Sequence, residues 1–496
     1  MENILLDKES QYILKMTKLL SAAPNHELSL SDLEMELGLA KQTIKSYFKK
    51  LLNYCQEQGL TTFSVESNHF KMTPDTAFNI FKLRHYLIQK SVKFHIMFRI
   101  FTDTSTTFTN LHQELGISRS KCSVHIKELN DYLADYDCHI NFIQKNPLLG
   151  EEHQIRFVFH NLFWGLDLND IIEKTSSLEA VSSLLLDFVP TLDYSTFLRI
   201  KLNFYIFQIN TRHGFFLAPE EDVFSTPDSP YVTYDNFFDK IEAIGFLDIC
   251  PDLETKQREC RYLYFLFCRA NLIMLETWKN TDLRVKHLHA PEIDDIIMQF
   301  QSKINFNLSV SELNYLHYNL ILMNQEASIF KGINRIFDLE EVTNEVHHTE
   351  ANTYTFINDF ILNYRDQNVE FKALIQHFPN LFRHYLILLK NILRQHKQPL
   401  KILVETISTP VHREMLISQV RDVSPVPIII STFNQLNGEQ PDAIISNWMP
   451  ENKYNDVPFF STSLFFSDWK ITNLNHFLNQ IADRKNNFSL TNDFVD

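Results

Sequence analysis

Glycine is scarce in this chain, and its cysteines follow no pattern. Only nine glycines occur in 496 residues, against a typical share of about 7%, so Gly-rich phosphate loops are scarce and helix is favoured. The six cysteines show neither C-x-x-C spacing nor the density of a disulfide framework, which indicates reduced thiols. Neither a signal peptide nor an apolar run of roughly 20 residues occurs. We therefore expect a soluble, cytoplasmic protein with no membrane partner.

Catalytic and metal-binding patterns are missing as well. The sequence has no G-x-S-x-G, no Walker loop and no metal-ligand spacing. Two pairs of histidines, His347 with His348 and His287 with His289, could suggest a metal site. Neither pair has a third candidate ligand at the spacing of a known metal site. We expect no enzymatic activity, no cofactor and no metal site.

Negative charge dominates the chain, but unevenly. The net charge is −15, while residues 1–160 hold 18 Lys+Arg and 18 Asp+Glu and are neutral. The remainder holds 28 basic and 43 acidic residues. DNA affinity depends on a local basic face rather than on total charge. The acidic remainder therefore does not exclude nucleic acid, and it would orient the docking.

Two stretches near the N-terminus share the pattern of a helix-turn-helix. They are LSLSDLEMELGLAKQTIKSYFKKL at 28–51 and TFTNLHQELGISRSKCSVHIKEL at 107–129. Each predicts a short amphipathic helix, a turn centred on Gly38 or Gly116, and a second helix that opens on small polar and basic residues. One match is weak evidence, but two in similar register make a regulator that binds double-stranded DNA the leading hypothesis.

DNA contacts are expected on the second helix of each stretch, because that helix can enter the major groove. Lys and Arg suit phosphates and guanine edges, and short polar side chains at a helix N-terminus suit phosphates. In both helices, small polar residues outnumber the side chains that can make two hydrogen bonds to one base, and this favours low base specificity. The candidates in the first stretch are Lys41, Gln42, Thr43, Lys45, Ser46 and Lys49. Those in the second are Ser118, Arg119, Ser120, Lys121, Ser123, His125 and Lys127.

The surroundings of both stretches predict winged units. In the first unit, residues 9–20 are predicted to form a helix. Ser31 is predicted to cap the next helix, with Glu34 as its capping-box partner. The segments TTFSVES and HFKMT are predicted to form a two-stranded wing around Asn68. Residues 74–102 are expected to be helical and to lead into the second unit. There, residues 138–144 and 153–159 are predicted as wing strands. The predicted apolar face comprises Leu111, Leu115, Ile117, Val124, Ile126 and Leu129.

In the rest of the chain, the predicted secondary structure changes once, after Pro399. From about 165 to 395 the pattern is almost entirely helical, in two segments that meet near Pro291. After Pro399, short apolar strands alternate with helices: KILVET, VPIIIS, DAIISN and VPFFST are the strands. That alternation predicts a small parallel α/β domain.

Several of these stretches resemble the Mga/RofA/AtxA family of transcription regulators of Gram-positive bacteria. NPLLGEEHQIR is similar to the family's G-x-E-x-x-I-R pattern through Gly150, Glu152, Ile155 and Arg156. LNYLHYNLILMNQ at 313–325 and QHFPNLFRHYLILL at 376–389 resemble the start and the last helix of the family's second helical module. PDAIISNWMP at 441–450 resembles the third strand of its C-terminal domain.

The resemblance implies a mainly α, multidomain fold that regulates virulence or metabolic genes. It also implies a homodimer formed through the C-terminal domain, and phosphocarrier proteins of the sugar phosphotransferase system (PTS) as partners. The implied domains are two winged helix-turn-helix domains (1–73 and 74–162), two all-α PTS-regulatory domains (163–288 and 289–397) and a small α/β domain like EIIB (398–490).

Histidines are the candidates for regulatory phosphorylation, because neutral imidazole is nucleophilic near pH 7. They are His213 in the first helical module and His317, His377 and His384 in the second. We expect His377 and His384 two turns apart on one helix face. The first module has Leu266 and Lys201 where the resemblance leads us to expect histidines. The C-terminal domain lacks the acceptor cysteine of EIIB, so phospho-relay is not expected there, although Ser408 and Thr409 are candidates for phosphate contact.

Two other functions remain open. One is an antiterminator-like regulator that binds RNA, which the paired helix-turn-helix units and the lack of a small RNA-binding β domain disfavour. The other is a sensor or scaffold whose helix-turn-helix units only contact protein. A regulator that binds duplex DNA, dimerises and responds to PTS-dependent phosphorylation is the preferred interpretation.

Overall fold

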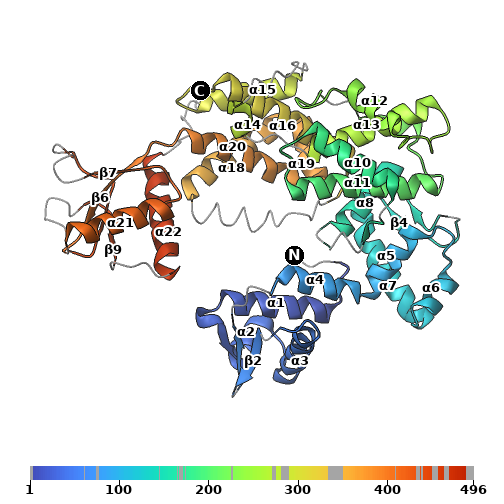
Figure 1. Ribbon diagram of the computed structural model, residues 1–496, viewed down its shortest axis with the longest axis horizontal. Helices are drawn as coiled ribbons and strands as arrows, with labels where there is room; N and C mark the ends of the chain where they lie inside the picture. Colours follow the sequence, from blue (N-terminus) through green and yellow to red (C-terminus); the bar gives the residue numbers. More distant parts are fainter. Residues whose placement is uncertain are drawn as a thin grey trace. The chain divides into compact units, whose positions relative to one another are not determined.

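Two compact units make up the chain in the computed structural model (Figure 1). The first comprises Met1–Leu272 with Ile329–Phe337, and the second Ile273–Ser328 with Asp338–Asp496. None of the described helices is both long enough and apolar enough to cross a membrane. The structure describes residues 4–60, 62–66, 68–73, 78–144, 146–164, 166, 171–173, 175–224, 227–270, 275–280, 290–332, 350–407, 409–431, 436, 439–448, 456–462 and 468–486.

The first unit begins with a helix-turn-helix. Ser29 forms a capping box with Asp32. The predicted cap of Ser31 and Glu34 is therefore wrong, because Ser29 has the extended backbone that an N-cap needs and Leu30 is already helical. Gly38 ends the helix at φ 63°, a conformation that glycine adopts at little cost. The helices are α1 (Lys8–Ala22), α2 (Leu30–Leu37) and α3 (Lys41–Glu57).

The wing that follows has one strand more than predicted. Strands β1 (Glu27–Ser29), β2 (Phe63–Glu66) and β3 (His69–Met72) form an antiparallel sheet in the order β1-β3-β2. Phe70 of the central strand is buried and meets the ring of Phe48 on α3 edge-on, 4.6 Å between centroids. This contact fixes the wing against the helix expected to contact DNA.

A second helix-turn-helix follows the same order of elements. The helical link predicted over 74–102 divides at Ser91, which precedes the second of its helices. Gly116 has φ +62° in the turn. The elements are α4 (Ile80–Gln89), α5 (Val92–Thr102), α6 (Phe108–Glu114), α7 (Arg119–Leu133) and the short 3-10 helix η2 (Ala134–Tyr136).

The second wing differs from the prediction. It consists of β4 (His139–Ile140) paired with β5 (Leu148–Leu149), while residues 153–159 lie in α8 (Glu152–Phe163). The prediction of a strand there was wrong: the stretch is a helix, buried on all sides from Glu152 to His160. The predicted strand stopped at residue 159, whereas Ile155, Val158, Phe159, Leu162 and Phe163 follow the i, i+3, i+4, i+7, i+8 spacing of a helix.

The remaining helices fall into two groups, one in each unit. Pro291 begins a helix, as predicted. The first unit contains α10 (Ser176–Phe188), α11 (Tyr194–Arg212), the 3-10 helix η3 (Pro219–Glu221), α12 (Tyr234–Ala243) and α13 (Leu253–Ala270). The second contains α14 (Leu275–Asn280), α15 (Pro291–Lys303), α16 (Val310–Ile329), α18 (Ala351–Gln367), α19 (Val369–His377) and α20 (Asn380–Gln395).

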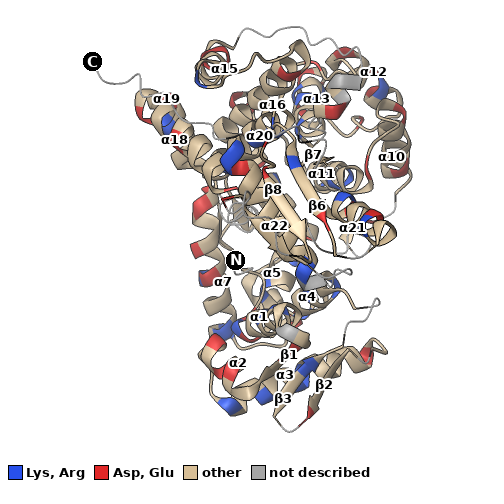
Figure 2. Cartoon of the chain, turned by 90° about the vertical axis from the view of Figure 1, so that its left-hand side faces the viewer, with Lys and Arg blue, Asp and Glu red and all other residues tan. Residues whose placement is uncertain are grey.

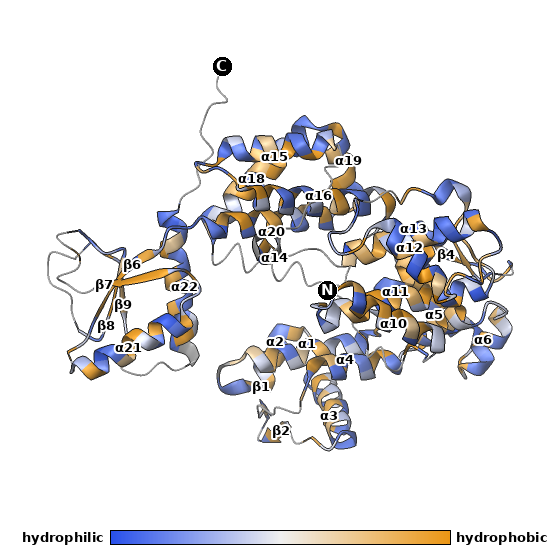
Figure 3. Cartoon of the chain, turned by 45° about the horizontal axis from the view of Figure 1, so that its top comes forward, coloured by the Kyte–Doolittle hydropathy of each residue, from blue (hydrophilic) through white to orange (hydrophobic). Residues whose placement is uncertain are grey.

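The C-terminal part has the predicted parallel α/β arrangement. Its strands pair in the order β7-β6-β8-β9, all parallel, and the apolar side chains of β6 and β8 pack against α21 and α22. Figure 3 shows the hydrophobic character of these strands. The elements are β6 (Leu400–Glu405), α21 (Pro410–Val423), β7 (Ile428–Ser431), β8 (Ala443–Ser446), β9 (Phe459–Ser461) and α22 (Asp468–Lys485).

Candidate nucleic-acid interface

Helix α7 exposes most of the side chains predicted to contact DNA. Its N-cap, Ser118, accepts a hydrogen bond from the backbone N–H of Lys121 at 3.2 Å. Cys122 and Leu129 are fully buried and fix the rotation of the helix. The exposed side chains that result are Arg119, Ser120, Lys121, Ser123, Val124 and Lys127, with the acidic Glu128 and Asp131.

Arg119 is supported by an aromatic ring of the preceding helix. Its guanidinium lies over Phe108, 5.8 Å from the ring centroid, a cation–π distance. Phe108 in turn contacts Phe142 of the wing, 6.1 Å between centroids. The wing thus positions the first cation of α7 through one intervening ring.

His125 differs from its neighbours in α7. Its side chain is only 17% exposed, and Nδ1 lies 3.5 Å from the Glu128 carboxylate, which also pairs with Lys93 at 3.1 Å. Burial acts to raise the pKa of Glu128, but the hydrogen bonds and charges of Lys93 and His125 lower it. Of the seven candidates in the second stretch, His125 is the one that is not exposed.

Helix α3 presents a denser cationic surface, visible in Figure 2. Lys45 and Lys49 are exposed and form no ion pair with any described residue. Lys41 lies 3.7 Å from Glu34 on α2, an exposed pair that contributes little energy. Gln42 and Ser46 are exposed as well, while Thr43 is half-buried.

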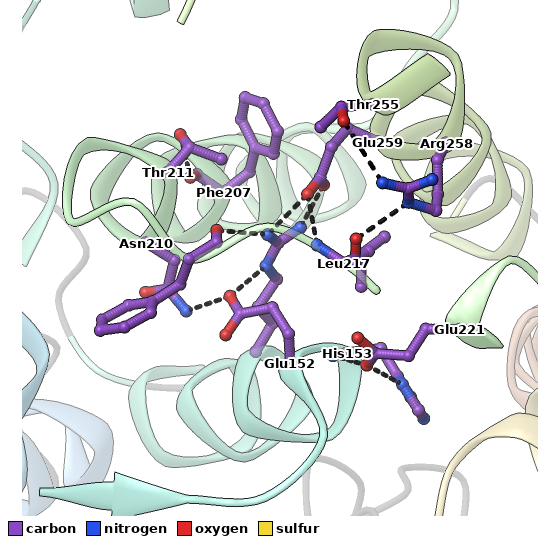
Figure 4. Close-up of polar contacts among 12 residues, drawn as sticks. Glu152, His153, Phe207, Asn210, Thr211, Leu217, Glu221, Thr255, Arg258 and Glu259 are labelled. Atoms are coloured by element: carbon purple, nitrogen blue, oxygen red, sulfur yellow. Dashed lines mark hydrogen bonds and ion pairs between the residues drawn. The ribbon is translucent and has the colours of Figure 1, made fainter. Parts of the chain in front are cut away.

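The Gly150–Arg156 motif does not form the wing; it begins α8. Gly150 allows a close approach, because a Cβ there would lie 2.7 Å from Cys138 Sγ. Arg156, 1% exposed, donates from Nε to Glu152 and from both Nη atoms to Glu259 on α13, at 2.6–3.1 Å (Figure 4). Asn210 on α11 donates to the same Glu152 oxygen at 2.8 Å. The motif therefore attaches the second helix-turn-helix to α11 and α13.

Residues 329–332, which begin with the last residue of α16, also pack on α8. The ring of Phe330 stacks on Phe157, 4.4 Å between centroids. Gln154 donates to the carbonyl of Lys331 at 2.8 Å and accepts from its N–H at 3.1 Å. A Cβ at Gly332 would lie 2.7 Å from the ring of Tyr136. These contacts belong to the first unit.

The four predicted phosphorylation sites differ in exposure. His213 caps α11 and is half-buried, and His377 is exposed at the end of α19. His317 is buried on α16, with Nε2 3.1 Å from Asp294. His384 is buried on α20. The paired histidines of 347–348 and 287–289, together with Ser408, lie outside the described residues.

His377 and His384 do not share a helix face, contrary to the prediction. They lie on α19 and α20, which are separated at Phe378 and Pro379. A proline disfavours helical backbone in the preceding residue, and Phe378 has φ −132° and ψ 80°. The two histidines therefore occupy separate elements.

Residues 76–163, which include α6, α7 and the second wing, match the family model of the Mga helix-turn-helix domain. The chain carries an Mga helix-turn-helix domain. This agrees with the resemblance to Mga-like regulators, and it indicates a DNA-binding regulator of transcription. No curated protein matches the chain.

Sequence reasoning missed three features of the Mga domain. Val124 was assigned to the buried face but is 54% exposed. Phe108 was not identified as the support of Arg119, and the partner of Arg156 was not identified as Glu259 on α13. Two signals in the sequence pointed to a helix at 152–163: the i, i+4 spacing of Glu152 and Arg156, and the helical spacing of the apolar residues from Ile155 to Phe163.

Proposed function

We propose that the chain regulates transcription by binding duplex DNA through α7 and α3, as a dimer whose activity responds to PTS-dependent phosphorylation. The Mga match at 76–163 carries the DNA-binding part of this proposal, because it coincides with the exposed cationic face of α7. In a helix-turn-helix, that second helix contacts base edges from the major groove.

The two helices are proposed to make different kinds of contact with DNA. α7 combines Arg119 and Lys121 with the short hydroxyls of Ser120 and Ser123, a mixture suited to phosphates and base edges together. α3 offers Lys45 and Lys49 without acidic partners among the described residues, and it would contribute mainly phosphate contacts. Affinity would then come from both helices and base readout chiefly from α7.

DNA binding is tested by its salt dependence. Arg119→Ala with Lys121→Ala should lower affinity for random duplex DNA about tenfold or more and reduce the slope of log K against log[salt] by about 2. The full-length chain is titrated onto labelled duplex at several salt concentrations. Lys240→Ala with Lys372→Ala, exposed lysines outside both helix-turn-helix units, is the charge-matched control and should change neither quantity.

Unchanged affinity in the Arg119/Lys121 variant would contradict the assignment of α7. Single-stranded RNA and bovine albumin serve as competitors. Displacement by RNA but not by duplex DNA would favour the antiterminator-like alternative. Absence of nucleic-acid binding of either kind would favour the scaffold.

Dimerisation through the C-terminal α/β domain is supported by exposed apolar side chains there. Ile407, Val411 and Trp448 are 67%, 72% and 55% exposed. The first and last are brought together, because the N–H of Ile407 donates to Asn447 at 3.0 Å. Exposed apolar groups of this kind mark interaction sites when they cluster. Sedimentation of the full chain with Trp448→Ser and Ile407→Ser measures the effect on association, with the 92% exposed Ile143→Ser as control.

Regulation by phosphorylation is supported by the path of the chain after His317. α16 carries that histidine and ends at Ile329, where residues 329–332 begin their contacts with α8. A phosphate on His317 would place a second negative charge next to Asp294, 3.1 Å from Nε2. Repulsion would shift α16, and the shift would reach the Mga domain through the covalent link at residue 329.

A further inference from the structure

Val124 is an apolar side chain in the middle of a polar surface. It is 54% exposed, whereas Cys122 two residues earlier is fully buried. Its neighbours on the outside of α7 are hydroxyls, cations and the carboxylate of Glu128, which pairs with Lys93 at 3.1 Å. The apolar stripe of the helix does not include it.

Helix geometry places Val124 at the centre of the surface predicted to face DNA. With 3.6 residues per turn, Ser120 lies one turn before it, and Lys127 and Glu128 lie one turn after it on the same side. All four residues are exposed, and the charge of Glu128 is offset by Lys93. Val124 is the sixth residue of α7, within the N-terminal part of the helix that contacts base edges in this motif.

An exposed valine is common at protein surfaces and often needs no explanation. Here two observations argue for a role. Valine is a weaker helix former than most residues, and at this position it is 54% exposed rather than part of the core. In α3 the sixth residue is Ser46, also exposed, so the same place in the first helix-turn-helix is polar.

We propose that Val124 recognises thymine through the 5-methyl group in the major groove. This methyl is the apolar group on a base edge of that groove, and apolar side chains contact it. The inference rests on the proposed entry of α7 into the major groove. Under it, Lys127 and Arg119 hold phosphates on either side, and Val124 gives the second unit a base preference that Ser46 does not give the first.

Replacing thymine by uracil tests this contact, because it deletes the methyl and keeps base pairing. Duplexes bound by the full-length chain are first selected from a random pool. Each thymine of a selected site is then replaced by uracil in turn. For the wild type, one position per bound α7 should weaken binding about fourfold, the effect of losing one buried methyl contact.

The substitution Val124→Ala removes both γ-methyls, so it should weaken binding to the thymine duplex by a similar factor and reduce the difference between thymine and uracil at that position. Val124→Thr retains one γ-methyl and should keep more of the difference. Val369→Ala, at an 82% exposed position on α19, is the matched control and should behave as wild type. Thermal unfolding checks that the variants remain folded.

The outcomes separate this inference from the proposed function. If the chain binds duplex DNA but uracil has no effect, or has the same effect in Val124→Ala, the thymine contact is overturned and DNA binding stands. If the chain binds no duplex DNA at all, the proposed function fails and the inference with it. A thymine-specific loss that depends on Val124 supports both.

Discussion

Arg156 carries one positive charge between two buried carboxylates, Glu152 and Glu259. Burial alone would lower the pKa of the guanidinium, but the charges of Glu259 and Glu152 raise it. Burial raises the pKa of Glu152, more than Arg156 and Asn210 lower it. Folding therefore disfavours the ionised form of Glu152.

The raised pKa of Glu152 predicts different results for two substitutions in this cluster. Arg156→Met should lower the free energy of unfolding by about 3–5 kcal/mol, because it leaves buried carboxylates without their partner. Glu152→Gln should be neutral or stabilising at pH 7, because a carboxyl whose pKa is raised by folding loses stabilising effect as pH rises through that pKa. Urea unfolding, with hydrogen exchange of α8 peptides, measures both. A loss in Glu152→Gln as large as that in Arg156→Met would contradict this account.

At the scale of elements, the second helix-turn-helix is held from two sides. One contact is the Arg156 cluster with α11 and α13. The other is the segment 329–332, whose Phe330 stacks on α8 and whose Gly332 lies against Tyr136. Elements distant in sequence thus determine the position of the proposed DNA-binding domain.

Gly332 permits a matched test of the second contact. Gly332 has φ +92° and Gly214 has φ +83°, but a Cβ at Gly214 meets nothing within 4 Å. Both alanine substitutions carry a backbone cost of about 1–3 kcal/mol. Gly332→Ala should cost about 1–3 kcal/mol more, because its Cβ overlaps the Tyr136 ring. Thermal and urea unfolding compare the two, and equal losses would show that the Tyr136 contact is unimportant.

Secondary structure followed from sequence wherever one face of an element is buried. Both helix-turn-helix patterns and strands β2 and β3 of the first wing were predicted in this way. The parallel strands of the C-terminal domain, where β8 is buried on both faces, were predicted from short apolar runs that alternate with helices. The prediction failed at residues 153–159 because that window ends before the helical apolar spacing of α8 is complete at Phe163. It failed at His377 and His384 because Pro379 separates α19 from α20. It also failed at Val124, where an apolar residue type suggested burial.

At the scale of the whole molecule, the part proposed to bind DNA and the part proposed to be phosphorylated differ in net charge. Residues 1–160 are neutral and contain both helix-turn-helix units, while all of the net charge of −15 lies in the remainder. Excess negative charge repels DNA and leaves the cationic surfaces of α3 and α7 as the favoured contacts. The remainder contains the proposed phosphorylation sites.

Incubation with a phosphorylated phosphocarrier protein should add acid-labile phosphate to the full-length chain at His317, His377 or His384. Exposure favours His377 as the first site to react, since His317 and His384 are buried. Mass spectrometry at neutral pH locates the phosphate, with exposed His476 as the internal control. Labelling of His476 at the same level, or no labelling, would remove this part of the proposal.

The sequence by itself determined the paired helix-turn-helix units, the neutral N-terminal third and the parallel α/β end, because these depend on local spacing and composition. Only the tertiary structure decided that Gly150–Arg156 anchors α8 rather than a wing, that residues 329–332 join the first unit, and that Val124 faces outward. Each of these depends on which distant residue fills the space next to it. The local periodicity of a sequence does not identify which distant residues come into contact.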